Sequence, residues 1–499
     1  MKGETAMKIF TLLSVIFPIV AGFALLIWRP ENRKTRNLYS ISVVTLNSCF
    51  VAATVLATAF VGKSVSAFEI FRLSANLNLA LAPDGASMVF GGIIGVLWPI
   101  TTIYAFSYME HEGRENKFFG FFIITYGVVA GIAFAANFFT MYLFYELMTL
   151  ATLPLVMHDM DAKARSAGKK YVLYSMSGAA LIFINIVILV LYGTTLDFTF
   201  GGVLDSAKLA GNETLLQAMF VLGFFGFGVK AAIFPLHDWL PSASVAPTPV
   251  TALLHAVAVV KSGAFGVMRL IYFGYGTSFL FGTPAQMIVI TASAFTIIYG
   301  SILALRTPHL KRTLACSTVA NLSYILLAFS LMTPQGMTGG FMHMIYHAVI
   351  KITLFFCAGA ILHNNRLENI DDMENLHKAM PVTCGVFVIA SLGLMGIPPL
   401  GGFTSKWTIA TAAASLNSWA GYVGCAGLIF SAVFTTLYLM PVVVRFYFPL
   451  KNSARLPENC HEADKEMTVT MVLLIVIMLA LSLCSQPISG WLSAIAAGM

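Results

Sequence analysis

Long apolar runs follow one another along nearly the whole of this 499-residue chain, separated by short polar loops. A helix needs about 20 apolar residues to cross the hydrocarbon core of a bilayer. Hydrophobic residues make up 58% of the chain and charged residues only 10%, far from the profile of a water-soluble domain. The sequence therefore predicts an all-α polytopic membrane protein with about fourteen transmembrane helices. That number of helices leaves no room for a sizeable soluble domain.

The apolar runs are predicted to form fourteen spans. They cover residues 7–28, 39–62, 88–109, 118–136, 138–157, 171–193, 214–235, 246–268, 285–305, 314–332, 338–362, 381–415, 419–444 and 467–494. The run 381–415 is too long for one straight crossing and contains Pro398 and Pro399 near its middle. We expect a discontinuous helix there, with an unwound centre. The run 214–235 ends in the same way, at Phe234-Pro235.

Basic residues are concentrated in the loops that follow odd-numbered spans. These loops contain Arg29, Arg33, Lys34, Arg36, Arg114, Lys117, Lys163, Arg165, Lys169, Lys170, Arg306, Lys311, Arg312, Arg366, Lys378, Arg445, Lys451, Arg455 and Lys465. The loops after even-numbered spans contain little beyond Lys63, Arg72, Lys208 and Arg269. The positive-inside rule then predicts that the odd loops are cytoplasmic and that both termini lie on the opposite side of an inner (plasma) membrane. The net charge of +7 follows from this topology and does not indicate nucleic-acid binding.

Five ionisable residues lie inside runs that are apolar enough to span a bilayer. They are Glu146, Lys230, Lys261, Lys351 and Lys406. A charge in hydrocarbon costs at least ~2.5–3.5 kcal/mol on insertion scales, so an intramembrane ionisable residue indicates a functional site. Burial favours a neutral lysine and a nearby carboxylate favours a charged one. A series of such groups is therefore interpreted as a proton relay.

Histidines extend this pattern. His343, His347 and Lys351 are spaced by four residues, so on a helix they form one stripe about 12 Å long. A helix-packing seam of satisfied polar groups is the alternative interpretation. His255 and Lys261 are six residues apart, about 120° around a helix axis, and share one path only if the helix distorts.

The sequence contains no pattern for a cofactor or a metal. The two histidines spaced by four residues lack a third zinc ligand, and no two of the seven cysteines have a CxxC spacing. No GxGxxG turn after a strand, GxxxxGK[ST] loop or haem-attachment pattern is present. We therefore expect no cofactor, no metal and no catalytic centre of its own.

Several ordered motifs give the chain a family resemblance over roughly residues 80–450. They are Tyr145-Glu146-Leu147-Met148, Gly228-Val229-Lys230 with Phe234-Pro235-Leu236-His237-Asp238-Trp239, Val260-Lys261-Ser262-Gly263, Leu310-Lys311-Arg312-Thr313, His343-Met344-Ile345-Tyr346-His347 with Lys351, and Gly396-Ile397-Pro398-Pro399 with Lys406. With these motifs the chain resembles the antiporter-like subunits shared by respiratory complex I, the Mrp-type multisubunit cation/proton antiporters and membrane-bound hydrogenases.

The resemblance implies two inverted five-helix repeats, at 118–280 and 285–450, each with one broken helix. A three-helix segment at 1–110 would precede them, and a loop with a last span at 451–499 would follow. It also implies roles for four residues. Glu146 would pair with Lys230, Lys261 would continue the axis and Lys406 would end it.

The function expected from this resemblance is proton translocation within a complex I-like redox-driven assembly. Its partners would be other membrane subunits, protons and the lipid bilayer. One alternative is an Mrp-type Na+/H+ antiporter subunit, and another is a structural scaffold. For single residues, Glu146 could simply tie helices together, Lys230 could extend to the interface, and Lys406 could satisfy backbone carbonyls freed by the helix break. Lys311 and Arg312 are interpreted as anchors on the cytoplasmic side.

Overall fold

The structure is a computed structural model that describes residues 2–61, 67–74, 77–448 and 460–498. The basic loop residues Lys63, Lys451 and Arg455 lie outside this part of the chain. Thirteen helices within it are long and apolar enough to cross a membrane. The prediction of an all-α polytopic membrane protein is confirmed.

The thirteen candidate spans match thirteen of the predicted runs. They are α1 (Lys2–Trp28), α2 (Arg33–Val61), α3 (Gly85–Tyr108), α4 (Glu115–Ala133), α5 (Phe138–Val156), α6 (Ala162–Tyr192), α8 (Glu213–Lys230), the span Thr248–Tyr275 made of α10 (Thr248–Ala256), α11 (Val259–Arg269) and the π-helix η4 (Leu270–Tyr275), α13 (Pro284–Leu305), α14 (Leu310–Ser330), α15 (Pro334–Asn365), α18 (Trp419–Tyr447) and α19 (Lys465–Leu483). The remaining run, 381–415, forms two helices of 15 residues each, α16 (Pro381–Met395) and α17 (Gly401–Ser415).

Shorter elements connect these helices. They are the helices α7 (Ser206–Leu209), α9 (Trp239–Ser242), α12 (Thr277–Leu280) and α20 (Ser485–Ala496), the 3₁₀ helices η2 (Met109–His111), η3 (Ala243–Val245), η5 (Ile370–Asp372) and η6 (Leu376–Lys378), and the strands β1 (Phe68–Ser74) and β2 (Leu77–Leu81). The two strands pair as an antiparallel hairpin that the sequence did not predict. All residues of β1 after Phe68 are exposed, so the strand lacks the apolar and polar alternation that indicates a half-buried strand.

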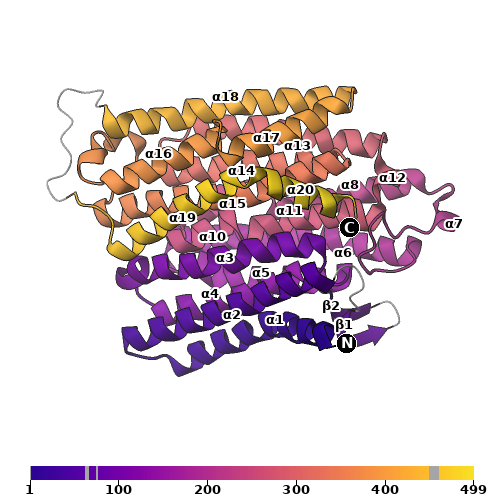
Figure 1. Cartoon of the computed structure of the whole chain (residues 1–499), viewed down its shortest axis with the longest axis horizontal. Helices are drawn as coiled ribbons and strands as arrows, with labels where there is room; N and C mark the ends of the chain where they lie inside the picture. The colour runs from indigo at the N-terminus through magenta and orange to yellow at the C-terminus, as the bar shows by residue number, and fades with distance from the viewer. Residues whose placement is uncertain (1, 62–66, 75–76, 449–459, 499) are drawn as a thin grey trace.

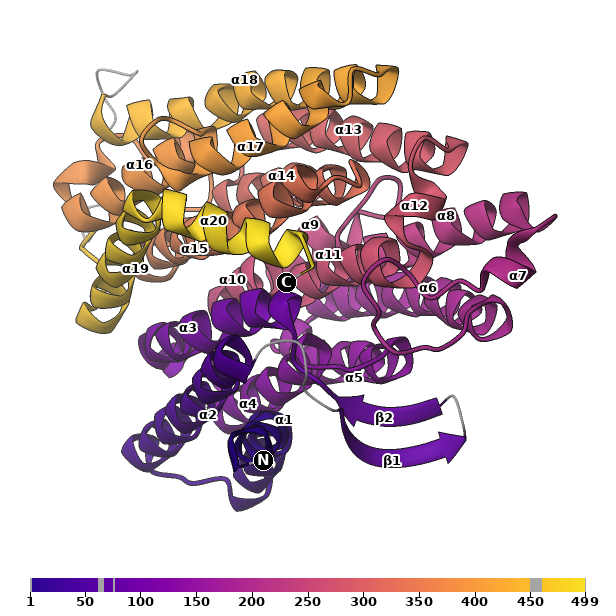
Figure 2. The same cartoon turned by 45° about the vertical axis from the view of Figure 1, so that its right-hand side comes forward.

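The helices at the centre of the bundle include several that carry ionisable residues. Figures 1 and 2 show α1 and α2 on one side of the molecule and α13 and α18 on the opposite side. Between them lie α10, α11, α14 and α15, whose residues are buried almost throughout. Because these helices are surrounded by protein rather than lipid, they can carry ionisable side chains at a lower cost.

The predicted break at Pro398-Pro399 is confirmed. α16 ends at Met395, Gly396 follows with a φ of +88°, and α17 begins at Gly401. The predicted break near Pro235 is also present, but α8 already ends at Lys230. These interrupted helices are the fourth members of the two predicted five-helix sets, while the inverted relation of the sets stays a prediction.

Two predicted spans are not the continuous helices that were expected. The run 246–268 is divided at Val257 and Ala258, where the N–H of Ala258 bonds to the carbonyl of Leu253, five residues back. The first set therefore contains two interruptions, not the single one implied by the resemblance. The run 467–494 is divided at Cys484 into α19 and α20, which Figure 2 shows at a clear angle to each other.

Candidate functional site

The first ionisable cluster lies where α8 ends against α5. Lys230 is the last residue of α8 and is 1% exposed. Its ammonium donates a hydrogen bond to the backbone carbonyl of Tyr145 and lies 3.6 Å from the centroid of the Tyr145 ring. The buried ammonium does not extend to the interface, which argues against that alternative for Lys230.

Glu146 follows Tyr145 directly and interacts electrostatically with Lys230. No ion pair within 4.0 Å joins the two side chains in the described structure. Glu146 is half-buried, and its Oε1 has no hydrogen-bond partner among the described residues. The two residues are therefore neighbours whose charges interact without direct contact, and their pairing during transport stays a prediction.

Lys261 and His347 form a buried contact between the two predicted helix sets. Lys261 lies on α11 and His347 on α15, and both side chains are buried. The distance from Lys261 Nζ to His347 Nδ1 is 2.6 Å. An ammonium donates to a neutral imidazole nitrogen, so this contact can pass a proton in either direction.

The stripe on α15 continues from this contact. The ring centroids of His347 and His343 are 5.8 Å apart, and His343 Nδ1 lies 3.0 Å from the hydroxyl of Ser405 on α17. Nε2 of each histidine has no partner among the described residues. The structure thus brings His343 and His347 together with Lys261 and adds the hydroxyl group of Ser405.

Lys351 lies one helical turn beyond His347 and faces a different helix. Its ammonium donates to the carbonyl of Leu314 at 2.9 Å and to the hydroxyl of Ser317, both on α14. This makes Lys351 a side branch of the line formed by Lys261, His347 and His343.

Lys406 lies beside Ser405, at the break between α16 and α17. Its ammonium donates to the carbonyls of Leu394 and Met395, at 2.6 and 3.2 Å. These are the last two carbonyls of α16, which its own helical hydrogen bonds leave open. The alternative in which Lys406 satisfies freed carbonyls is therefore observed, and it is compatible with proton exchange.

Lys230 and Lys406 have similar surroundings, because each ammonium lies near a tyrosine ring. The ammonium of Lys230 lies over the ring of Tyr145, and that of Lys406 lies 5.4 Å from the ring centroid of Tyr324. Each lysine belongs to the interrupted fourth helix of its set, and each tyrosine to the second. These tyrosines were not singled out from the sequence, although Tyr145 adjoins Glu146 in a quoted motif.

His255 is not in contact with the other predicted relay residues. It is fully buried near the end of α10, and neither ring nitrogen has a hydrogen-bond partner among the described residues. Its ring lies 4.9 Å from that of Phe355 on α15. The interruption at Val257 separates it from Lys261, which is the distortion that a shared path would require.

α11, which carries Lys261, closely approaches the end of α8, which carries Lys230. A Cβ atom on Gly263 would lie 2.6 Å from the amide nitrogen of Ala231 and 2.9 Å from the carbonyl carbon of Lys230. Only glycine permits this approach. Among the described side chains, however, no hydrogen bond connects Lys230 with Lys261 directly.

Two basic residues assigned to loops are in fact buried. Lys311 is 6% exposed and donates to the carbonyl of Ala246 at 2.6 Å, so it is a buried residue, while its role as an anchor on the cytoplasmic side stays a prediction. Arg269 is fully buried at the end of α11, paired with Asp84 through contacts of 2.5 and 2.7 Å. Three phenylalanine rings, those of Phe198, Phe265 and Phe273, surround its guanidinium.

The side chains of the candidate relay have the chemistry that a proton path requires. Its groups are ammonium, imidazole, hydroxyl and carboxylate, which exchange protons without forming other bonds. Among the described residues, no group of three or more His, Cys, Asp or Glu side chains is placed to hold a metal ion.

Known proteins resemble the chain over most of its length. It is 30% identical over 437 residues to hydrogenase-4 component B of Escherichia coli (strain K12), covering 83% of this chain and 63% of that protein. It is 27% identical over 493 residues to the A/B component of a probable K(+)/H(+) antiporter of Rhizobium meliloti (strain 1021), covering 97% of this chain and 48% of that protein. The chain thus spans about half to two thirds of the length of these curated relatives.

A solved structure and a family description agree with these relatives. A chain of the membrane-bound sulfane sulfur reductase, an archaeal respiratory membrane complex, has the same fold, with a TM-score of 0.83 and 21% sequence identity over 98% of this chain and 97% of that chain. Residues 135–435 match the family described as NADH:quinone oxidoreductase/Mrp antiporter, TM. Since this match covers more than half of the sequence and contains all of the predicted relay residues, the chain belongs to the NADH:quinone oxidoreductase/Mrp antiporter family of membrane proteins.

Proposed function

We propose that the chain is a proton-translocating membrane subunit of a complex I-like redox-driven assembly, of the NADH:quinone oxidoreductase or membrane-bound hydrogenase type. The observation that carries this proposal is the buried contact between Lys261 Nζ and His347 Nδ1, 2.6 Å long, between the two helix sets. The family and the resemblance to hydrogenase-4 component B support the redox-driven interpretation. Other subunits would carry out the redox reaction and supply the driving force.

The proton would move by exchange along the buried line. An imidazole accepts a proton on one ring nitrogen and releases one from the other, so His347 can pass a proton from Lys261 toward His343. Ser405 and Lys406 would receive it at the break between α16 and α17, where Ser405 contacts His343. In this proposal Lys351, held by α14, and His255, on α10, lie beside the line as branches.

Glu146 and Lys230 would control proton release within the first helix set. A charged Glu146 stabilises a charged Lys230, so moving or protonating the carboxylate would release the proton of the lysine. This control acts through electrostatics, since no ion pair joins the two side chains in the described structure. The packing of α11 at Gly263 against the end of α8 keeps Lys230 close to the helix that carries Lys261.

Proton flux in proteoliposomes that contain the native complex tests the proposal. We expect His347→Phe to abolish flux, since phenylalanine fills the space of the ring but has no proton acceptor. The control is His461→Phe, which alters an exposed histidine outside the helices and should leave flux unchanged. Normal flux in His347→Phe would remove the central contact from the pathway.

The alternative is a component of a cation/proton antiporter, favoured by the resemblance to the probable K(+)/H(+) antiporter of Rhizobium meliloti. In that case proton movement requires Na+ or K+ on the opposite side and no redox substrate. Measuring proton flux with each cation, with and without a redox donor, separates the two functions. A scaffold role predicts no dependence of flux on the relay residues at all.

We further propose the orientation and the partners. The loops after α1, α3, α5, α8, α13, α15 and α18 would face the cytoplasm and both termini the opposite side of the plasma membrane. Cysteine labelling from each side of sealed vesicles tests this orientation. Other membrane subunits are the expected partners, and their identification by mass spectrometry after copurification would decide which assembly contains the chain.

A further inference from the structure

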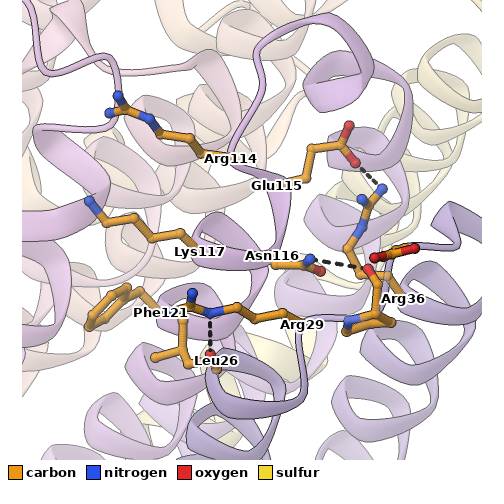
Figure 3. A pocket seen from close by; sticks show the side chains of 10 residues that line it. Leu26, Arg29, Arg36, Arg114, Glu115, Asn116, Lys117 and Phe121 are labelled. Atoms are coloured by element: carbon orange, nitrogen blue, oxygen red, sulfur yellow. Dashed lines mark hydrogen bonds and ion pairs between the residues drawn. The ribbon is translucent and has the colours of Figure 1, made fainter.

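A basic pocket lies outside the candidate relay, at the end of the bundle where the loops after α1 and α3 meet (Figure 3). Its volume is about 740 Å³. The residues that line it are Leu26, Arg29, Pro30, Glu31, Arg36, Arg114, Glu115, Asn116, Lys117 and Phe121. Four basic side chains outnumber two carboxylates, so the pocket carries an excess of two positive charges.

One side of the pocket is already neutralised. Arg36 forms an ion pair with Glu115 and donates to the side-chain oxygen of Asn37 at 3.2 and 3.0 Å. Asn116 donates to the carbonyl of Pro30 at 3.1 Å, which ties α4 to the loop after α1. These contacts hold the pocket in shape and leave its positive excess on the remaining basic residues.

Three of the basic side chains form no ion pair among the described residues. The Arg29 side chain donates to the carbonyl of Leu26 at 2.9 Å, and that of Arg114 donates to the carbonyl of His158 at 3.4 Å. The Lys117 ammonium has neither a hydrogen bond nor an ion pair among the described residues. In Figure 3 the side chains of Arg29, Arg114 and Lys117 extend toward the same side of the view, away from the contact of Arg36 with Glu115. Three positive groups on one side of a pocket suit an anion with several oxygens.

The backbone supports this arrangement. Arg29 and Arg114 have φ angles of 47° and 52°, a left-handed conformation that is uncommon for residues other than glycine. Residues held in such conformations are concentrated at sites that bind ligands. Here they aim two arginines from two different loops at one pocket.

The remaining lining and the outer surface of α1 fit a lipid better than a soluble anion. Leu26 and Phe121 give the pocket apolar walls beside its cations. On the outer face of the same end of α1, Phe23, Ile27 and Trp28 are 52%, 82% and 55% exposed. Tryptophan is enriched at the membrane interface, where headgroups lie next to acyl chains. A molecule with a phosphate and acyl chains would contact both surfaces.

We propose that this pocket binds the phosphate of an anionic phospholipid headgroup, whose acyl chains lie along α1. Basic pockets between transmembrane helices on the cytoplasmic side bind such headgroups, and this end of the bundle carries the loops predicted to be cytoplasmic. The proposal does not depend on proton transport, since no residue of the candidate relay lines the pocket.

The test measures the lipids retained by the purified full-length complex. Wild-type protein is exchanged into detergent micelles that contain equal amounts of phosphatidylglycerol and phosphatidylcholine, and bound lipid is counted by native mass spectrometry. We expect the wild-type protein to retain phosphatidylglycerol preferentially. The triple pocket variant, which combines Arg29→Gln, Arg114→Gln and Lys117→Gln, should weaken this retention about fivefold for each charge removed. The matched control removes three exposed charges outside the pocket with Lys163→Gln, Arg165→Gln and Lys169→Gln and should retain lipid normally.

Several outcomes would overturn the proposal. They include equal retention of the two lipids, an equal loss in the pocket and control variants, and displacement of the lipid by millimolar inorganic phosphate, which would indicate a site for a soluble anion. Crosslinking of the pocket to an acidic segment of a neighbouring polypeptide would also overturn it. If the triple pocket variant does not insert, the single variant Lys117→Glu decides, because this half-buried side chain makes no hydrogen bond or ion pair among the described residues that the substitution would break.

Discussion

The ammonium of Lys261 on α11 lies 2.6 Å from Nδ1 of His347 on α15, and both side chains are buried inside the bundle. Neither residue has a carboxylate partner among the described ion pairs. A buried lysine whose partner is a neutral base can lose its proton to that base, whereas a carboxylate partner would keep it charged. The contact therefore favours proton exchange over a purely structural role.

The first prediction follows from this contact. Lys261→Met should abolish proton flux, because methionine has no proton to exchange. The midpoint of thermal unfolding should fall only modestly, because removing a buried charge offsets part of the about 1–3 kcal/mol that it costs to leave His347 Nδ1 without its partner. Flux in proteoliposomes and the midpoint of thermal unfolding check the two parts. A loss of the folded, inserted protein together with flux would indicate a structural role.

Glu146 provides the second prediction. Its half-buried carboxylate has an oxygen without a partner, so Glu146→Gln should cost little stability while removing the charge that acts on Lys230. We expect proton flux to fall about tenfold or more in Glu146→Gln and in Glu146→Ala. Glu146→Asp, which retains a carboxylate, should do less harm. Unchanged flux in Glu146→Gln would exclude the residue from the pathway.

Lys406 has two roles that substitutions can separate. Lys406→Arg keeps a cation on the carbonyls of Leu394 and Met395, but arginine stays protonated at any accessible pH. The variant should therefore retain the wild-type midpoint of thermal unfolding and lose proton flux. Lys406→Met should lose both, because the two carbonyls are then left without their donor, at about 1–3 kcal/mol. Normal flux in Lys406→Arg would leave Lys406 with the structural role alone.

His255 gives the fourth prediction. Both of its ring nitrogens are buried without a hydrogen-bond partner in the described structure, a cost that an apolar ring avoids. His255→Phe should therefore leave the midpoint of thermal unfolding equal or higher, while flux falls if the proton path branches there as proposed. Wild-type flux with raised stability would show that His255 is a core residue only.

The sequence predicted the parts of the fold that depend on local signals. Apolar runs indicated the spans, and Pro398-Pro399 indicated the break between α16 and α17. The break after Ala256 was missed because the residues there, Val257 and Ala258, include neither proline nor glycine. Only the surrounding helices can impose this conformation.

For the candidate site, residue type and spacing predicted which groups are buried but not what they contact. The four-residue spacing placed His343 and His347 on one face of α15, as the structure has them. The spacing could not predict that Lys261 meets His347, since these residues are 86 positions apart, nor that Ser405 contacts His343. Such contacts depend on how the helices pack, which periodicity does not describe.

The last prediction concerns the ion pair of Arg269 and Asp84, which joins α11 to the start of α3 across 185 positions of sequence. Arg269 has no exposed surface, so removing its partner leaves a buried charge at a cost of about 3–5 kcal/mol. Asp84 also caps α3 by accepting the N–H of Ser87 at 2.9 Å. Asparagine is an equally good cap, so Asp84→Asn isolates the loss of the ion pair.

A double variant shows whether the cost of losing Asp84 comes from the unpaired charge that Arg269 then carries. We expect Asp84→Asn to lower the midpoint of thermal unfolding strongly, and Asp84→Asn with Arg269→Met to restore most of it, because methionine packs among Phe198, Phe265 and Phe273 without a charge. Proton flux in the folded double variant should be close to normal, since neither residue contacts the candidate relay. If the double variant is as unstable as the sum of the two single variants, the charge on Arg269 is not what makes the loss of Asp84 costly.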